Sequence, residues 1–483
     1  MFAGLIRTTK RALRFCWQLT SSEKLSRRVL LSKSAQSLGI PLYSHSRGIS
    51  FGGFSKESSD VHHLVSEAIG WSVLSISQIP SDELKDRKLR GDVAFREGRY
   101  EDFFAEFKAI EDVRQQIRAD APTSISNLNI LMSDWTGPFG NIGLIDQFLK
   151  HSRLRLPNSQ TVLLTSLESS ANPTLVSLFG KEISTIFLPK LEVSRLESML
   201  RIFREPLEVR TSNFRCLDQY KWMEVADVEW QASERDPVLG LSDDIEKRGR
   251  EILKTWGIQE DDWFVGLHVR DESTPGRNAC NADIDTYLPA IREIIALGGH
   301  VVRLGSSDSK PLPSMKGLID YAKSIKKSSW LDVFLMARCR FFIGTHAGPL
   351  GIPQMFGVPT LCTNSPHVAL SMSMPRSVVI PKTLVDSVSG RVLTLAESMR
   401  EPAAWTFSDE ISGKVKRVDN TASEIVGGVR EILQIAELGN TLSFSLSPVA
   451  QEIRKRENAR GTIPISETFL ESKLQVCSAF LSV

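Results

Sequence analysis

From about residue 127 onward, short apolar runs alternate with segments of helical periodicity, and this alternation restricts the possible fold more than any other feature of the chain. A first series predicts strands at 127–133, 161–167 and 185–188 and helices at 144–150 and 191–203. Short buried strands that alternate with helices form parallel sheets with helices on both faces. We therefore expect a Rossmann-like lobe over residues 126–245.

A second series of the same kind occupies residues 246–440. Its expected strands are 263–269, 300–304, 341–343 and 360–362, and its expected helices are 244–256, 284–297, 314–325, 331–338, 350–356 and 424–437. Two such series predict an α/β protein with two Rossmann-like lobes and a cleft. Ligands of these sheets bind outside the carboxyl ends of the strands.

The chain outside the two series divides into three further parts. Residues 1–60 form a basic leader and a Ser/Gly-rich linker, and residues 61–125 predict a helical extension. Within this extension, 84–97 and 101–119 have helical spacing, and the string GDVAFREGRYEDFFAEF at 91–107 has the small/aromatic rhythm of one tetratricopeptide-like hairpin. Such a hairpin needs another surface to cover its apolar face. Residues 441–483 are expected to form a C-terminal tail that packs back on the protein.

The basic leader is compatible with more than one role. Residues 1–34 hold eight Lys and Arg residues and one acid, Glu23, without the apolar run that a signal peptide requires. A peripheral contact with an anionic membrane, a transit peptide and a solvated leader are the alternatives. The first alternative would place the protein at the cytoplasmic face of the inner membrane.

Charge and cysteine usage exclude several classes of protein. The formal net charge is +2, so no overall positive field favours a nucleic-acid partner. No run of about 18 apolar residues predicts a transmembrane helix. The six cysteines form no CxxC pair, which disfavours a zinc site and a disulfide framework and favours a cytoplasmic protein with reduced thiols.

The strongest candidate site begins in the segment WFVGLHVRDE, residues 263–272. An apolar strand leads there directly into His268, Arg270, Asp271 and Glu272. Charged groups at the carboxyl end of a buried strand lie at the opening of the ligand crevice. The permanently charged, planar guanidinium of Arg270 suits a pyrophosphate group, because it can bind two oxygens at once.

A second candidate element lies within residues 328–360. The expected strand FFIG runs into the turn Gly344-Thr345-His346-Ala347-Gly348, and Pro349 is well placed at the beginning of the next helix. A glycine-rich turn that opens a helix presents free backbone N–H groups and the positive end of the helix dipole. The turn from Gly344 to Gly348 is therefore a candidate phosphate site.

The region from Trp263 to Thr363 resembles bacterial glycosyltransferases linked to surface-polysaccharide synthesis. It shares with them an HVRD strand end, Arg277-Asn278-Ala279 before Tyr287, the strand Val301–Gly305, PLP at 311–313, a WxDVF-like string at 330–334 and FFIGT…G…P…FGVP at 341–359. The tail ARGTIPISETFLES is also similar, and the HxR strand end resembles the donor-binding arginine motif of GT-B fucosyltransferases. The resemblance is strongest over 255–365, weaker over 127–250 and 420–472, and absent over 1–80.

This resemblance implies a GT-B-like fold and a nucleoside-diphosphate-sugar donor. The donor-binding residues expected from it are His268, Arg270, Arg303, Gly344, Thr345, His346 and Gly348. Arg270 would bind the diphosphate, Arg303 is a second candidate cation, and the glycine turn would hold phosphate through its backbone. The relatives have Ser or Thr before the second glycine, whereas this chain has His346-Ala347, so a hydroxyl contact to phosphate is lost.

The sequence leaves the catalytic base open. An inverting transferase needs a group that takes the proton of the acceptor hydroxyl. The candidates are the carboxylates Asp134, Asp271 and Glu272, with His268 and His346 as further alternatives. Asp134 begins the loop DWTGPFGNIG, whose glycines would let backbone approach the donor or the acceptor.

One pair of acids has the spacing of a metal site. Asp283 and Asp285 match the DxD pattern of metal-dependent transferases, but they stand at the start of an expected helix. Asp is favoured there because it caps free N–H groups and faces the positive end of the dipole. We therefore expect a structural role for the pair, and neither a metal ion nor a cofactor.

Together these features predict a metal-independent glycosyltransferase with a nucleotide-sugar donor and a glycan or lipid-linked acceptor, active in surface-polysaccharide synthesis. One alternative is a sugar-nucleotide epimerase or hydrolase, which would consume the donor without an acceptor. Another is a degenerate transferase that binds a nucleotide sugar, or acts as a scaffold through its helical hairpin.

Overall fold

The computed structural model describes residues 100–200, 235–273, 278–366, 376–398 and 413–438 almost throughout, with shorter stretches between 63 and 94 and between 203 and 233, and isolated residues at 401, 403 and 475–476. The expected basic leader, its membrane contact and nearly all of the expected tail lie outside these residues. In the part of the chain that is described, no helix has both the length and the hydrophobicity of a membrane span.

The chain divides into two compact units that alternate along the sequence. One unit contains the described residues up to Asp134, with Leu156–Ser170 and Gly180–Glu208; the other contains Trp135–Arg155, Ala171–Phe179 and the chain from Val209 onward. Two segments that the sequence assigns to the N-terminal lobe, 135–155 and 171–179, therefore group with the C-terminal sheet.

The first unit is built on a parallel sheet in the order β1-β2-β3. Its elements are α5 (Tyr100–Ala119), β1 (Leu128–Leu131), β2 (Gln160–Thr165), β3 (Ser184–Phe187) and α8 (Lys190–Leu200), with a helix over residues 63–71. Apolar residues of the sheet, of α8 and of the helix at 63–71 form one core. Arg118 ties the end of α5 to this sheet, because its guanidinium donates to the carbonyl oxygens of Ser126 and Leu128.

The second unit contains a seven-stranded sheet in the order β14-β11-β10-β9-β6-β7-β8, and its pairings are parallel. The strands are β6 (Phe264–His268), β7 (His300–Leu304), β8 (Leu318–Ile319), β9 (Phe342–Thr345), β10 (Thr360–Ser365), β11 (Ser377–Pro381) and β14 (Gln475–Val476). With β6 counted as the first strand, the order is that of a doubly wound Rossmann sheet.

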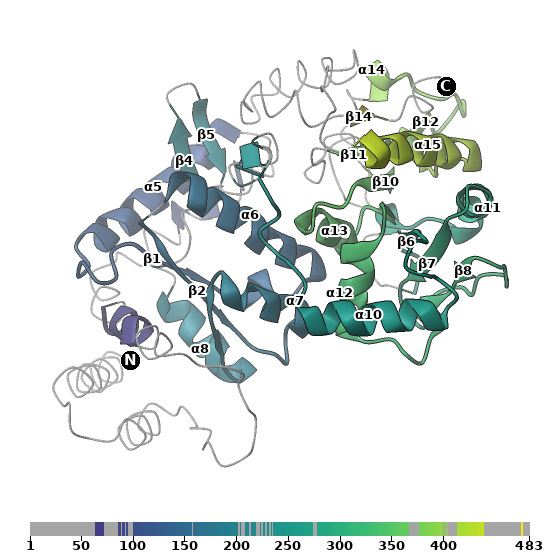
Figure 1. The fold of residues 1–483 in the computed structure, drawn as a ribbon. Coiled ribbons are helices and arrows are strands. Elements are labelled where there is room, and N and C mark those ends of the chain that lie inside the picture. The colour runs from purple at the N-terminus through teal and green to yellow at the C-terminus, as the bar shows by residue number, and fades with distance from the viewer. Residues whose placement is uncertain are drawn as a thin grey trace. The chain divides into compact units, whose positions relative to one another are not determined.

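Helices cover both faces of this sheet (Figure 1). On one face, α11 (Leu288–Ala296) and α15 (Ala422–Leu438) share a core with β6, β7, β9, β10 and β11. On the other face, α12 (Ser329–Arg338) contacts both α10 (Asp243–Thr255) and α13 (Gly351–Met355). Helix α15 approaches the strands closely at Gly428, where a Cβ would lie 2.8 Å from Ile380.

The remaining elements are short or belong to small pairs. They are η1 (Ser133–Trp135), α6 (Phe139–Arg155), α7 (Pro173–Leu178), η2 (Phe179–Lys181), η4 (Asn278–Cys280), η5 (Ile284–Tyr287), η6 (Tyr321–Lys323), η7 (Gly348–Leu350) and α14 (Leu395–Ser398). The strands β12 (Thr383–Asp386) and β13 (Val415–Val418) pair antiparallel, and β4 (Glu208–Thr211) pairs with β5 (Phe214–Asp218).

The alternating pattern in the sequence predicts most of these elements correctly, with one clear error. The helix expected at 314–325 is wrong, because the chain forms the short strand β8 and the 3₁₀ turn η6 there. Gly317 has a φ of +88°, a left-handed conformation that interrupts a helix. The strands from β11 to β14, and the pair β4–β5, are not among the elements expected from the sequence.

Helix α6 carries a buried cluster of charged side chains. Lys150 lies 2.7 Å from Asp146 and also pairs with Asp227, and each of these side chains is at most 3% exposed. Two carboxylates face one ammonium, and burial of this uneven set raises the pKa of Asp146 to about 6. Burial alone would lower the pKa of Lys150, but the two carboxylates raise it above its ordinary value.

We expect Lys150→Met to lower the free energy of unfolding by about 3–5 kcal/mol, because it leaves two buried carboxylates without a counter-charge. Asp146→Asn should cost less, because it leaves one ammonium paired with one carboxylate. Since the folded-state pKa of Asp146 lies above its ordinary value of 3.8, its contribution to stability is largest at low pH and falls as the pH rises through about 6. In urea unfolding between pH 4 and 7, the wild type should therefore lose stability relative to Asp146→Asn as the pH rises; a constant difference would contradict this.

Candidate functional site

The sheet of the second unit has a topological switch point between β6 and β9. From β6 the chain proceeds outward to β7 and β8, and it then returns to β9 and continues through β10 and β11 on the other side. The loops after the two central strands diverge at such a point, and ligands bind between them. These loops begin after His268 and after Thr345, so the two motifs selected from the sequence meet at the switch point.

Backbone contacts fix the relation between the two loops. In the β6–β9 pairing, His268 lies opposite Gly344. The backbone N–H of Arg270 donates to the Thr345 hydroxyl over 3.0 Å, and the Arg270 carbonyl accepts from the N–H of Ala282 over 2.9 Å. Thr345 is fully buried, so its hydroxyl holds the neighbouring loop. Hydrogen bonds at its N–H and at its carbonyl thus fix the backbone of Arg270, while its side chain is partly exposed.

His268 ends β6 as a neutral side chain. Burial, together with the positive charges of Arg303 and Arg270, lowers the pKa of His268 to about 4. Its Nδ1 is buried and has no hydrogen-bond partner among the described residues. A buried polar atom in this state is costly unless a ligand or a water satisfies it, which favours a binding role for this end of β6.

Arg303 has a different environment from the one expected. Its side chain is 1% exposed, and it donates to Asp320 Oδ1 over 2.9 Å and to the Lys310 carbonyl over 3.1 Å. The enclosed guanidinium ties the end of β7 to the loop over 305–312. We therefore correct its expected role from a cation that contacts the ligand to one that positions this loop.

The three candidate carboxylates differ in their surroundings. Asp271 accepts from the backbone N–H of Ser273 over 3.0 Å and from its hydroxyl. Burial would raise the pKa of Asp271, but these hydrogen bonds outweigh it and the net shift is downward, which makes Asp271 a weak base. Glu272 is exposed beside it. Asp134 is exposed on η1 and belongs to the other unit, so its role stays a prediction.

The turn after β9 leads into two consecutive short helices. His346 is buried, and its Nδ1 lies 3.4 Å from the Ser365 hydroxyl. Ala347 occupies the N-cap position of η7 and makes no side-chain capping bond. Of the three residues of η7, Pro349 has no N–H group and the N–H of Leu350 donates to the Ala347 carbonyl over 3.0 Å, so Gly348 is the residue whose N–H can contribute to a phosphate site here.

The second glycine of the turn packs against another glycine. A Cβ on Gly348 would lie 2.6 Å from the backbone N of Gly140, and a Cβ on Gly140 would lie 3.1 Å from the Gly348 Cα. Gly140 stands at the beginning of α6, a helix of 17 residues. The positive end of the α6 dipole therefore lies against the turn, where it favours an anion. Part of the expected loop DWTGPFGNIG is thus the first turn of this helix.

The first acid of the DxD pair has the capping position expected from the sequence. Asp283 is the N-cap of η5, and its side chain accepts from the N–H of Asp285 over 3.1 Å. Lys310 lies 2.5 Å from Asp285. In the described part of the chain, no group of three or more His, Cys, Asp or Glu side chains is arranged to hold a metal ion. Arg277 of the resemblance pattern lies outside the described residues.

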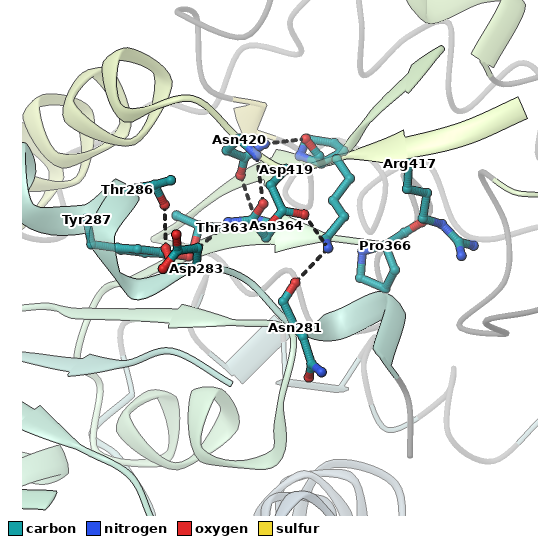
Figure 2. A network of polar contacts seen from close by, with 12 residues as sticks. Asn281, Asp283, Thr286, Tyr287, Thr363, Asn364, Pro366, Arg417, Asp419 and Asn420 are labelled. Carbon is teal, nitrogen blue, oxygen red and sulfur yellow. Dashed lines mark hydrogen bonds and ion pairs between the residues drawn. The ribbon is translucent and has the colours of Figure 1, made fainter. Parts of the chain in front are cut away.

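A buried polar network lies behind the turn, and the sequence gives little sign of it. Figure 2 shows Tyr287, Thr363, Asn364 and Asn420 at the carboxyl end of β10, joined by hydrogen bonds. Tyr287 is noticeable in the sequence only as part of the resemblance pattern. A run of polar residues directly after the apolar start of β10 is the one local signal for Thr363 and Asn364.

Comparison with known proteins gives structural neighbours of low identity. The chain matches no protein-family profile and no curated protein sequence. A glycosyl transferase family 9 protein from Veillonella parvula has a TM-score of 0.40 and 12% identity, and the match covers 64% of this chain and 96% of that one. ADP-heptose LPS heptosyltransferase II from E. coli has a TM-score of 0.40 and 13% identity over 64% and 99% of the two chains.

A third similar structure is the dodecameric iron-containing heptosyltransferase TibC in complex with ADP-D-beta-D-heptose. It has a TM-score of 0.35 and 12% identity, and the match covers 64% of this chain and 77% of that one. All three similar structures are glycosyltransferases. At these identities and TM-scores, the likeness assigns no activity to this chain.

The glycine contact at the turn gives a direct prediction. Gly348→Ala should lower the free energy of unfolding by about 1–3 kcal/mol, because the added methyl group overpacks against the backbone of α6. Gly240→Ala is the matched control, because a Cβ at Gly240 meets no atom within 4 Å. Thermal and urea unfolding of both variants measure the difference. Equal stability of the two variants would show that the close approach of Gly348 and Gly140 does not exist.

Proposed function

We propose that this chain is a glycosyltransferase that moves a sugar from a nucleoside-diphosphate sugar to a hydroxyl of a glycan or lipid-linked acceptor. The donor diphosphate binds at the switch point, between the loop after β6 and the turn after β9. The two units with parallel sheets correspond in this proposal to the two lobes of a GT-B-like enzyme.

The observation that carries the proposal is the convergence of Arg270 and the turn from Gly344 to Gly348 at the carboxyl ends of two adjacent parallel strands. A diphosphate needs a cation that grips two oxygens and a set of backbone donors. Arg270 supplies the first, and the turn, with the N-terminus of α6 packed against it, supplies the second. The unpartnered Nδ1 of neutral His268 adds a polar contact that carries no charge.

The proposed chemistry is electrostatic. The bond between the anomeric carbon of the sugar and the diphosphate oxygen breaks, and its electron pair leaves with the diphosphate. The acceptor oxygen forms the new bond to the anomeric carbon and gives its proton to a base. Negative charge therefore grows on the diphosphate, where Arg270 and the backbone N–H groups stabilise it without a divalent cation.

The proposed base is one of two exposed carboxylates, Asp134 and Glu272. Asp271 is less suited, because the hydrogen bonds from Ser273 and the loop after β7 lower its pKa and hold it in place. A base must reach the acceptor hydroxyl and keep a pKa near the working pH. We therefore assign Asp271 to the shaping of its own loop.

Donor binding is the first test. In a thermal-shift panel of UDP-glucose, GDP-mannose, ADP-glucose and dTDP-glucose with EDTA present, one donor should stabilise the wild type, by about 2.7 kcal/mol at a hundredfold excess over its dissociation constant. Arg270→Ala should abolish this shift, and Arg270→Lys should keep only part of it because the forked geometry is lost. The control is Arg248→Ala, an exposed arginine of the same unit that pairs with Asp244.

The outcomes of this panel separate the alternatives. If no donor shifts the wild type, the proposal is wrong. A donor that binds but is not consumed favours a degenerate nucleotide-sugar-binding protein, and consumption without an acceptor favours a hydrolase or an epimerase. A shift that appears only after removal of EDTA and addition of a divalent cation would contradict the metal-independent mechanism.

The identity of the base is a separate prediction. The substitution that removes it, Asp134→Asn or Glu272→Gln, should lower kcat by about 100- to 10,000-fold and leave the donor dissociation constant unchanged. Asp271→Asn is the comparison, and it should weaken donor binding together with kcat because it loosens the loop after β6. Full activity of both Asp134→Asn and Glu272→Gln would exclude these carboxylates and leave Asp271, His268 and His346 as the alternatives.

A further inference from the structure

A continuous chain of hydrogen bonds leads from Asn420, two residues before α15, to the candidate phosphate turn. Tyr287 Oη and Thr363 Oγ1 are 2.6 Å apart, and Thr363 Oγ1 donates to the Gly344 carbonyl over 3.3 Å. Asn364 Nδ2 donates to Tyr287 Oη over 2.9 Å. Figure 2 shows these side chains together with Asn420. Each of the four side chains named here is at most 1% exposed.

The donors and acceptors in this chain run in one direction. Thr363 gives its hydroxyl proton to the Gly344 carbonyl, so Tyr287 must donate to Thr363. The amide nitrogen of Asn364 then donates to the Tyr287 oxygen. Successive donors of this kind polarise one another in a low-dielectric interior, so the chain is stiffer than separate bonds would be.

The chain of hydrogen bonds starts at two asparagines, each of which donates its backbone N–H to the side-chain oxygen of the other. Asn364 N donates to Asn420 Oδ1 over 2.5 Å, and Asn420 N donates to Asn364 Oδ1 over 2.7 Å. Asn420 Nδ2 also donates to the Pro381 carbonyl at the end of β11 over 2.8 Å. Asn364 has a φ of +52°, a conformation that asparagine tolerates better than most residues. The orientation of the Asn364 amide is therefore determined by its backbone partner.

The chain of hydrogen bonds ends at the peptide group of Gly344, where the turn begins. Thr363 holds the carbonyl of Gly344, and the next residue, Thr345, receives the backbone N–H of Arg270 on its hydroxyl. A shift of this peptide would move both the turn and the backbone of Arg270. The side chains that form these hydrogen bonds are buried, so they offer no surface to a ligand.

We infer that Tyr287, Thr363 and Asn364 are positioning residues of the donor site, which hold the turn after β9 and the backbone of Arg270 in the geometry that binds a diphosphate. The inference rests on the function proposed above. It assigns to these residues an effect on donor affinity that exceeds their effect on stability.

The test compares two buried tyrosines of the same unit. Tyr287→Phe removes the tyrosine hydroxyl from the chain of hydrogen bonds. Tyr321→Phe removes a hydroxyl that accepts from the Ser328 N–H over 3.0 Å and has no part in that chain of hydrogen bonds. Thr363→Val removes the bond to Gly344, and Thr363→Ser keeps it. Calorimetric titration with UDP, GDP, ADP and dTDP, with a thermal unfolding curve for each variant, gives the dissociation constant and the stability side by side.

Tyr287→Phe and Thr363→Val should raise the dissociation constant of the bound nucleoside diphosphate by about threefold to tenfold, the equivalent of one lost hydrogen bond. Tyr321→Phe and Thr363→Ser should bind as the wild type does, although Tyr321→Phe loses comparable stability. The inference is overturned if Tyr287→Phe and Thr363→Val bind with wild-type affinity, or weaken binding only as much as Tyr321→Phe. Absence of binding to the wild type would instead overturn the proposed function, and the inference with it.

Discussion

The parallel pairing of β6 with β9 is the interaction on which the candidate site depends. It brings Arg270 and Thr345 within hydrogen-bond distance although 75 residues separate them in the chain. A slip of one residue would turn every side chain of a strand to the opposite face. Alternation of contacts on the two faces prevents this: Val265, Leu267 and Ile343 face the core with α11 and α15, while a Cβ at Gly266 would lie 2.5 Å from Phe342 on the other face. The small residue on β6 therefore helps to fix the register in which Arg270 meets Thr345.

Buried polar groups then fix the loops at this edge of the sheet. Two such contacts join Arg303 to Asp320 and Asn364 to Asn420. On folding, these groups exchange hydrogen bonds to water for hydrogen bonds inside the protein, and this exchange adds little net stability. They are costly to break, however, because a partner left behind in the interior remains unsatisfied. Their main effect is therefore to select one conformation of the loops, which a site that recognises an anion through backbone N–H groups requires.

The sequence predicts the parts of the fold that depend on local patterns and misses the parts that depend on distant partners. Continuous apolar runs locate β6, β7, β9 and β10 to within three residues of their observed bounds, and β7 matches at both ends. The capping role of Asp283 follows from its position before a helix. The helix expected at 314–325 fails because Gly317 adopts a positive φ. The burial of Arg303 depends on Asp320, 17 residues further on, and the hydroxyl of Tyr287 meets Thr363 after 76 residues, so neither contact can be read from spacing.

In the proposed function, the electrostatics of the switch point require that its attraction for an anion is local. Asp320 pairs with Arg303, and Asp271 directly follows Arg270 in the sequence, so these four side chains together carry no net charge. His268 adds none, since burial and its two arginine neighbours keep it neutral above about pH 5. What is left to favour a diphosphate in the proposed function is geometry: the fork of one arginine and the backbone of the turn, with the positive end of α6 against it. Binding through such short-range donors is less sensitive to salt than binding through a charged surface would be. It also depends strongly on the exact backbone of the turn.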